Sequence, residues 1–139
     1  MPQLALTDEE ILNCFDVMFE LRPHLVKQTF VNIIKMMQKE GYHLAYIKDN
    51  NQLVALAGYR MYHNLFMGKH LYVDDLVTSS NHRSHGYGKQ MIDWIKNVAL
   101  ENGCNICHLD SGTHRAAAHK FYFKEGFNIA SYHFSQKLS

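Results

Sequence analysis

The sequence has no excess of charge of one sign and no long apolar run. Lysine and arginine number 14 and aspartate and glutamate 13 among 139 residues, which gives a net charge of +1. Phosphate-rich partners normally require a clustered basic excess, so we do not expect nucleic acid as a partner. A membrane span requires about 18 consecutive apolar residues or more, and no window approaches that length, so no membrane partner is expected.

The sequence also lacks an export signal and has few cysteines. Met1–Leu4 has neither the basic nor the apolar region of a signal peptide, which predicts a cytoplasmic protein with reduced thiols. Cys104 and Cys107 have the C-x-x-C spacing, but a structural zinc site needs about four ligands and the remaining cysteine, Cys14, is isolated. A redox pair would open a helix, whereas this pair follows a helix-ending Asn102–Gly103. We therefore interpret the cysteines as small buried residues.

Histidine, a common metal ligand, is abundant for this length, with ten copies. The arrangement most open to a ligand role is His82 and His85 around Arg83, with His114 and His119 further along the chain. No H-E-x-x-H or similar ligand set occurs. We predict no metal site, and interpret the histidines as surface or pocket residues, some of which contact phosphate or substrate.

The length and the hydrophobic fraction of 47% predict one globular domain over residues 1–139. Thr7 and Glu10 have the spacing of a capping box, which marks the start of a helix. Helical periodicity alternates with short stretches of period two and with turn residues. The expected helices cover 7–22, 25–41, 86–101 and 115–124, and the expected strands cover 42–47, 53–62, 71–78, 106–110 and 127–138.

The most informative stretch lies where the strand at 71–78 gives way to a helix. Arg83 is followed by Gly86, Gly88 and Lys89. Glycines allow the backbone to approach a ligand closely, and the free amides of a helix start attract anions. Arg83 and Lys89 add charge-assisted contacts to a phosphate. The stretch is neither a P-loop nor a complete dinucleotide fingerprint, and a tight strand-to-helix turn would also explain the glycines.

A second signal lies in the last predicted helix. Phe121, Tyr122 and Phe123 precede Gly126 and Phe127. An amphipathic helix with aromatic core contacts explains most of this pattern. A tyrosine whose hydroxyl reaches a pocket can also act as a proton donor, which makes Tyr122 a candidate catalytic residue.

Together these two segments resemble the GNAT superfamily of acetyl-CoA-dependent N-acetyltransferases. Residues 83–88 match the family's pyrophosphate loop, [Q/R]-x-x-G-x-[G/A], and residues 121–127 match its F-Y-x-x-x-G-F segment. Residues 75–78 resemble the strand that hydrogen-bonds pantetheine. The resemblance implies an α/β (α+β) fold with a single mixed, mostly antiparallel central sheet. That sheet would be splayed at the acetyl-CoA site and flanked by about four helices.

The resemblance also implies roles for individual residues in a direct transfer of acetyl to an amine. Tyr122 would protonate the leaving sulfur, and the backbone N–H of Val77 would bind the thioester oxygen. Asp75 would be the base, with a water chain as the alternative. Strand alternation is expected to send Asp74 and Asp75 to opposite faces, so that only one lines the cleft. The residues expected to bind acetyl-CoA are Leu76, Val77, Thr78, Arg83, Ser84, His85, Gly86, Tyr87, Gly88, Lys89 and Arg115, the last standing where the family often has asparagine.

Three segments resemble the small-molecule amine branch of the family, which includes aminoalkylphosphonate acetyltransferases: residues 20–22, 42–45 and 118–122. The sequence therefore predicts an acyltransferase that acetylates the primary amine of a small molecule. The alternatives are an acyl-CoA-binding module without turnover, a protein or peptide N-acetyltransferase, and a metal or redox protein. The sequence leaves the identity of the amine and the formation of a homodimer open.

Overall fold

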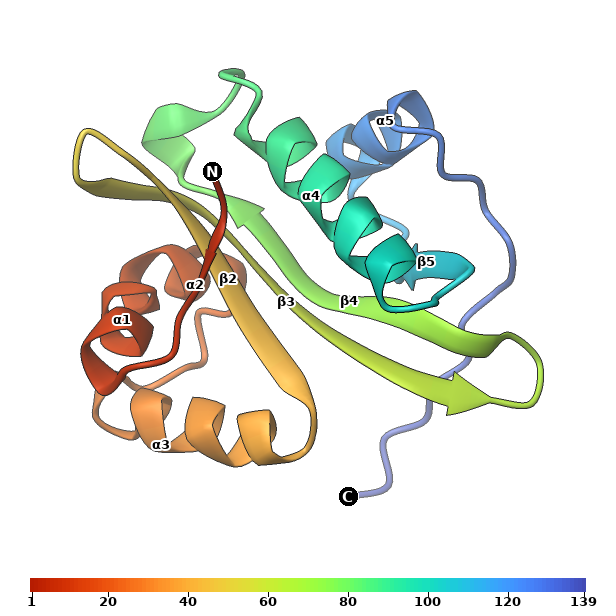
Figure 1. The fold of residues 1–139 in the computed structure, drawn as a ribbon, viewed down its shortest axis with the longest axis horizontal. Helices are drawn as coiled ribbons and strands as arrows, with labels where there is room; N and C mark the ends of the chain where they lie inside the picture. The colour runs from red at the N-terminus through yellow and green to blue at the C-terminus, as the bar shows by residue number, and fades with distance from the viewer.

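The computed structural model describes residues 1–139, which form a five-stranded sheet in the order β1-β2-β3-β4-β5 (Figure 1). All neighbouring strands are antiparallel except β4 and β5, which are parallel. The predicted mixed, mostly antiparallel sheet is therefore confirmed. The strands are β1 (Gln3–Leu4), β2 (Tyr42–Asp49), β3 (Gln52–Asn64), β4 (Gly68–Thr78) and β5 (Ile106–Leu109).

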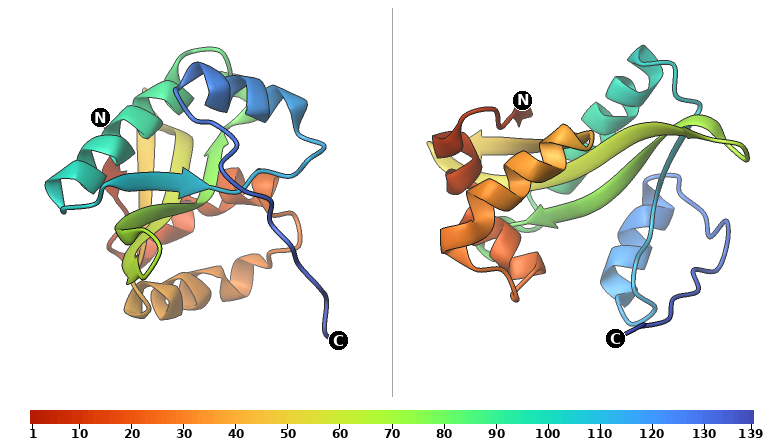
Figure 2. Two further views of the ribbon diagram at one scale, coloured as in Figure 1. Left: turned by 90° about the vertical axis from the view of Figure 1, so that its right-hand side faces the viewer. Right: turned by 90° about the horizontal axis from the view of Figure 1, so that it is seen from below.

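Helices α1 to α3 cover one face of the sheet, and α4 covers the other (Figures 1 and 2). None of the helices combines the length and the apolar character that crossing a bilayer requires. The helices are α1 (Asp8–Asn13), α2 (Phe15–Leu21), α3 (Lys27–Lys39), α4 (Tyr87–Glu101) and α5 (Ala116–Lys124), with a short 3-10 helix η1 (Ser80–His82).

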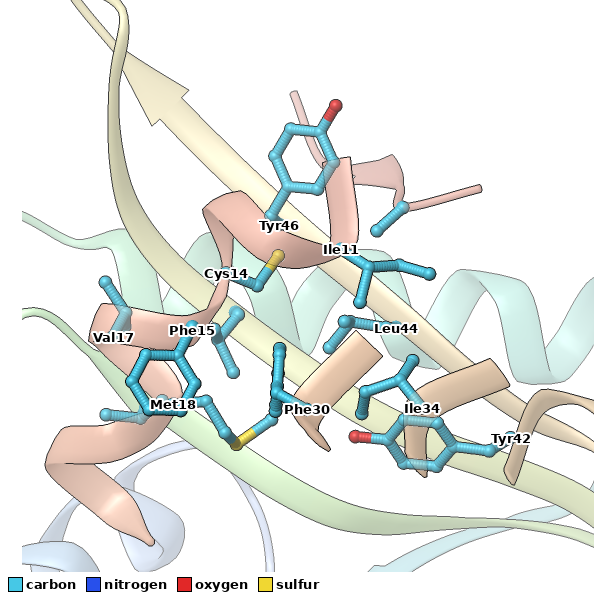
Figure 3. Close-up of a cluster of buried hydrophobic side chains, with 13 residues drawn as sticks. Ile11, Cys14, Phe15, Val17, Met18, Phe30, Ile34, Tyr42, Leu44 and Tyr46 are labelled. Carbon is cyan, nitrogen blue, oxygen red and sulfur yellow. The ribbon is translucent and has the colours of Figure 1, made fainter. Parts of the chain in front are cut away.

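Two hydrophobic clusters hold these layers together, one on each face of the sheet. The first contains 13 buried residues, among them Ile11, Phe30 and Leu44 (Figure 3). The second contains 12, and Met91 and Ile95 of α4 pack there against the sheet. Burial of a side chain of this size contributes about 1.5–3 kcal/mol. The sheet is therefore fixed from both sides, and its central strands form a rigid base for the site described below.

The first predicted helix is present as two. The capping box is confirmed: the Glu10 N–H donates to the Thr7 side chain, and the Glu10 carboxylate accepts from the Thr7 N–H. The helix breaks at Cys14, because its N–H bonds to the Ile11 carbonyl three residues earlier and its thiol donates to the Glu10 carbonyl. The chain therefore has five α-helices, where about four were expected.

The prediction of a strand over 127–138 is wrong. This segment has no backbone partner in the sheet, and Ile129 and Phe134 are 71% and 91% exposed. In this segment His133 Nδ1 lies 3.6 Å from Oδ1 of Asp110, the residue after β5, a contact that is an ion pair when the histidine is protonated. Alternation of apolar residues favours a strand only where a neighbouring strand accepts its hydrogen bonds. The sheet therefore ends at β5.

A β-bulge in β4 lies at the edge of the site described below. Gly58 lies opposite Asp75, but its neighbour Tyr59 lies opposite Val73, so Asp74 is an extra residue in β4. On its other side, β4 pairs with β5 only over His70–Val73. The two strands separate beyond this point, which leaves one edge of β4 without a partner.

Candidate active site

A cavity of about 470 Å³ opens where β4 and β5 separate. Small-molecule sites have volumes of this order, about 300–1,000 Å³. Its walls come from the end of α2, from β4, from the loop after β5 and from α5. The residues that line it are Glu20, Leu21, Arg22, Val73, Asp74, Leu76, Leu109, Asp110, Gly112, His114, Arg115 and Tyr122.

Of the two neighbouring carboxylates in β4, Asp74 lines the cavity and Asp75 does not. Asp74 is paired with Arg60: the Arg60 Nη2 donates to Oδ1 at 3.1 Å, and Nε lies 3.0 Å from Oδ2. Burial raises the pKa of Asp74 above its usual range, and Arg60 opposes this rise. Asp74 is thus a carboxylate with a raised proton affinity at the cavity wall.

Asp75 contacts the helical layer, and both of its carboxylate oxygens are engaged. Oδ1 accepts from the Arg22 Nε at 3.0 Å, and Oδ2 accepts from the Tyr42 hydroxyl at 2.7 Å. Tyr42 lies directly across from Arg60, so Asp74 and Asp75 bind partners on the same face of the sheet. The expectation that alternation separates them is therefore wrong, because the bulge interrupts the alternation.

Tyr122 of α5 and Arg115 at the N-cap of that helix both line the cavity. Burial raises the pKa of the Tyr122 hydroxyl, and the charge of Arg115 opposes that rise. The phenol therefore carries its proton throughout the neutral range. This arrangement provides a half-buried O–H donor at the cavity wall.

The unpartnered edge of β4 supplies backbone donors. Ser79 donates its N–H to the Val54 carbonyl of β3, and antiparallel pairing directs alternate residues to the same neighbour. The N–H of Val77 is then directed toward β3, whereas those of Leu76 and Thr78 are directed toward the open edge. The geometry therefore favours Leu76, which also lines the cavity, over Val77 as a backbone donor to a ligand.

The loop before α4 presents free amides. The first backbone bond of α4 is donated by Gln90 to the Gly86 carbonyl, and no side chain caps this end. The N–H groups of Tyr87, Gly88 and Lys89 thus have no helical acceptor. Such a helix N-terminus attracts anions, which fits a pyrophosphate group.

The two glycines of the loop serve different purposes. Gly86 has φ +83°, a left-handed conformation that other residues rarely adopt, and a Cβ there would meet nothing within 4 Å. Gly88 has no such φ; a Cβ there would lie 3.3 Å from Cζ of Phe121 in α5. Gly86 therefore directs the amides at the helix start, and Gly88 allows α5 to pack against α4.

Some charged and polar side chains of the loop are exposed, and others are bonded to neighbouring side chains. Arg83, Ser84 and His85 are exposed. Lys89 is engaged, with its Nζ 2.9 Å from Asp93 Oδ2 and 3.4 Å from a Glu125 carboxylate oxygen. Tyr87 is engaged as well, since its hydroxyl donates to Asp49. Arg83 is thus better placed than Lys89 to reach an anion.

The sequence assigned no catalytic or binding role to several residues of the cavity wall, among them Glu20 and Asp110. Asp110 accepts a hydrogen bond from the Tyr72 hydroxyl at 2.6 Å, and Glu20 accepts one from the Ser80 N–H at 2.9 Å. These groups come together from α2 and from the end of β5, and no short motif contains them. One signal was available, because Asp110 is the last residue of a predicted strand.

All three cysteines are free. Cys14 is completely buried, and burial raises the pKa of its thiol to about 12 and that of the Cys107 thiol to about 11. A thiol nucleophile reacts as the thiolate, which neither group forms near neutral pH. No group of three or more His, Cys, Asp or Glu residues could hold a metal ion.

Single replacement of Cys14, Cys104 or Cys107 by serine is expected to leave turnover within the range of the wild type. The buried Cys14 and Cys104 variants should lose about 0.5–3 kcal/mol in the free energy of unfolding, since a polar group replaces an apolar one. Denaturant unfolding and steady-state kinetics measure the two quantities separately. Loss of turnover in a folded Cys107→Ser variant would indicate a covalent mechanism.

Comparison with known proteins identifies the family of the chain. Residues 8–127 match the acetyltransferase (GNAT) family. The chain is 38% identical over 140 residues to YhdJ, an uncharacterized N-acetyltransferase of Bacillus subtilis (strain 168), covering 99% of this chain and 98% of that one. It is 25% identical to the aminoalkylphosphonate N-acetyltransferase of Salmonella typhimurium over 80 residues, which are 58% of this chain and 50% of that one.

Its fold is also that of a solved aminoglycoside N-acetyltransferase, AAC(6')-Iy in complex with CoA. The two structures superpose with a TM-score of 0.85 at 12% identity, over 100% of this chain and 96% of the other. The matched residues 8–127 include the loop at the start of α4, the open edge of β4 and Tyr122. The chain therefore belongs to the acetyltransferase (GNAT) family, the acetyl-CoA-dependent N-acetyltransferases.

Proposed function

We propose that this protein transfers the acetyl group of acetyl-CoA directly to the primary amine of a small molecule. The observation that carries the proposal is the cavity between β4 and β5, which is of small-molecule size and holds Tyr122 and the carboxylates Glu20, Asp74 and Asp110. Carboxylates at a cavity wall attract an ammonium group. The similarity to an aminoalkylphosphonate N-acetyltransferase also favours a small amine.

Acetyl-CoA, when bound, supplies an acetyl thioester. The amides at the start of α4, Arg83 and the open edge of β4 would hold it. The chain itself must then take a proton from the ammonium, donate a hydrogen bond to the thioester oxygen and give a proton to the sulfur. We assign the hydrogen bond to the Leu76 N–H and the proton for sulfur to the Tyr122 hydroxyl.

Two neighbouring carboxylates compete for the role of base. Asp75 is the residue that the sequence predicts, but it lies outside the cavity lining, and Arg22 and Tyr42 bind its oxygens as Arg60 binds those of Asp74. Asp74 lines the cavity, and its raised pKa brings it closer to the pH at which a base is effective. We therefore favour Asp74, or a water chain that ends on it, and the assignment to Asp75 stays a prediction tested below.

Replacing Arg83 by alanine is expected to weaken CoA binding by about 1.5–3 kcal/mol, the value of one charge-assisted hydrogen bond. The effect should be smaller than that of changing Gly86, since backbone amides supply much of the anion site. Calorimetric titration with CoA measures the loss, and raised salt should reduce it. Lys89→Ala serves as the control and should change the affinity less, because Lys89 is already paired with Asp93.

The identity of the molecule that accepts the acetyl group distinguishes the proposed function from its alternatives. Release of CoA should be measured with acetyl-CoA and a panel of polyamines, amino acids, aminophosphonates, aminoglycosides and peptides with free N-termini. We expect at least one small amine to be acetylated with a higher kcat/KM than any peptide. Preference for the peptides would indicate a peptide N-acetyltransferase, and binding without turnover would indicate an acyl-CoA-binding module.

The proposal includes the remaining predictions from the sequence. One catalytic domain spans residues 1–139 and works in the cytoplasm, in keeping with three unpaired cysteines. Its partners are acetyl-CoA and the amine, and neither nucleic acid nor a metal ion takes part. Size-exclusion chromatography with light scattering tests whether a homodimer forms.

A further inference from the structure

Asp75 belongs to a contact set at the β4 bulge, which we name the Asp75 network: Arg22, Tyr42 and Asp75. Arg22 is the C-cap residue of α2, and Tyr42 is the first residue of β2. Besides binding the Asp75 carboxylate, Arg22 donates from Nη2 to the Asp74 carbonyl at 2.9 Å. The network thus ties α2 and β2 to both residues of the bulge.

The absence of a side chain at Gly58 of β3 makes the network possible. A Cβ on Gly58 would lie 1.8 Å from the Tyr42 hydroxyl oxygen and 2.3 Å from Cζ of the same ring. The Tyr42 ring therefore crosses β3 over Gly58 on its way to Asp75, which lies opposite Gly58 in the sheet. Tyr42 is only 2% exposed, and a buried hydroxyl without a partner is costly. Gly58 thus leaves the space that the Tyr42 ring occupies, and Asp75 is the partner that the buried hydroxyl requires.

The Asp75 network lies at the point of β4 where the edge that lines the active site begins. The bulge marks the point beyond which β4 is no longer paired with β5. The direction of the Asp74 side chain and of the open N–H groups that follow depends on this local backbone. Arg22 also joins the bulge to the end of α2, which forms the opposite wall of the cavity with Glu20.

We propose that Asp75 is a positioning residue for acetyl transfer: the Asp75 network fixes the β4 bulge, so that Asp74 and the Leu76 N–H face the cavity. This inference rests on the proposed function for its kinetic consequences only. A base must have a free lone pair that reaches the substrate. Both carboxylates are engaged, Asp75 by Arg22 and Tyr42 and Asp74 by Arg60, but only Asp74 lines the cavity and meets the positional requirement.

Hydrogen exchange tests the network without any substrate. In Tyr42→Phe and Asp75→Asn, the backbone amides of Asp75 and Val77, which are directed toward β3, should exchange at least about 10-fold faster than in the wild type. The amides of β2 that pair with the opposite half of β3 should not change. Arg22→Gln removes the more exposed partner of the network and repeats the test if a buried variant does not fold. Wild-type exchange in folded variants would overturn the proposal even if the enzyme proves to have another activity.

Kinetics then separate positioning from base catalysis. We expect Tyr42→Phe and Asp75→Asn each to lower kcat/KM by about 10- to 100-fold, as misplacement of reacting groups does. The double variant should be little worse than either single one, because both changes disrupt one unit. The acid limb of the pH profile should persist in Asp75→Asn and disappear in Asp74→Asn. Near-normal kinetics in Tyr42→Phe, or loss of the acid limb in Asp75→Asn alone, would overturn the proposal.

Discussion

Replacement of Tyr122 by phenylalanine is expected to lower kcat by about 10²–10⁴, the usual contribution of acid–base assistance. The variant keeps the ring, and with it the edge contacts to Phe121 and Phe127, so stability and CoA affinity should remain near those of the wild type. It removes only the proton that the hydroxyl donates. Burial raises the pKa of this hydroxyl, so the wild-type enzyme should keep its proton donor through the alkaline side of neutrality.

The matched control for this variant is Tyr132→Phe. Tyr132 lies in the C-terminal segment and is 83% exposed, so the same chemical change there should leave kcat unaltered. Steady-state kinetics and calorimetry with CoA give the two quantities. If Tyr122→Phe turned over at nearly the wild-type rate, Tyr122 would be a packing residue and water would protonate the leaving group.

Replacement of Gly86 by valine is expected to lower CoA affinity by roughly 100-fold or more. A β-branched residue at φ +83° carries strain of about 1–3 kcal/mol, which the chain relieves by rearranging the start of α4. The amides of residues 87–89 then no longer point to one anion. The fold should persist, because no atom lies within 4 Å of a Cβ at this position.

Gly103→Val provides the control at the other end of α4. Gly103 has φ +78° and also has open space around a Cβ, so its backbone strain matches that at Gly86. It lies after the helix, far along the chain from the loop, and CoA affinity should remain unchanged. Equal CoA affinity of Gly86→Val and the wild type would contradict the assignment of the pyrophosphate site.

Most of the fold was predictable because its signals lie in residues that are close together in the sequence. Thr7 and Glu10 carry their capping signal within four residues, and Asn50 and Asn51, between the predicted strands 42–47 and 53–62, have φ 51° and 63°. Such signals depend on neighbours in the sequence. The failed strand at 127–138 depended on a distant partner, because alternation says which face is apolar and not which strand is adjacent.

The site was predictable to a smaller extent, for the same reason. The loop around Gly86 and the residue Tyr122 each lie in a continuous sequence motif. The structure places Gly86 at the N-cap of α4 and Tyr122 in α5, as the sequence predicted. The bulge at Asp74 has no such motif, since it is defined by the register of two strands. Pairing of Asp75 with Arg22, 53 residues away, is a tertiary contact that a single sequence does not encode locally.

The central claim is direct acetyl transfer from acetyl-CoA to an amine in the cavity between β4 and β5. It is tested most directly by incubating the protein with acetyl-labelled acetyl-CoA, with and without the best amine of the panel, and following CoA release and the masses of protein and amine. The account predicts that CoA release requires the amine, that each CoA released corresponds to one acetylated amine, and that the protein mass does not change. Acetyl label on the protein, or binding of acetyl-CoA with no transfer to any amine, would contradict it.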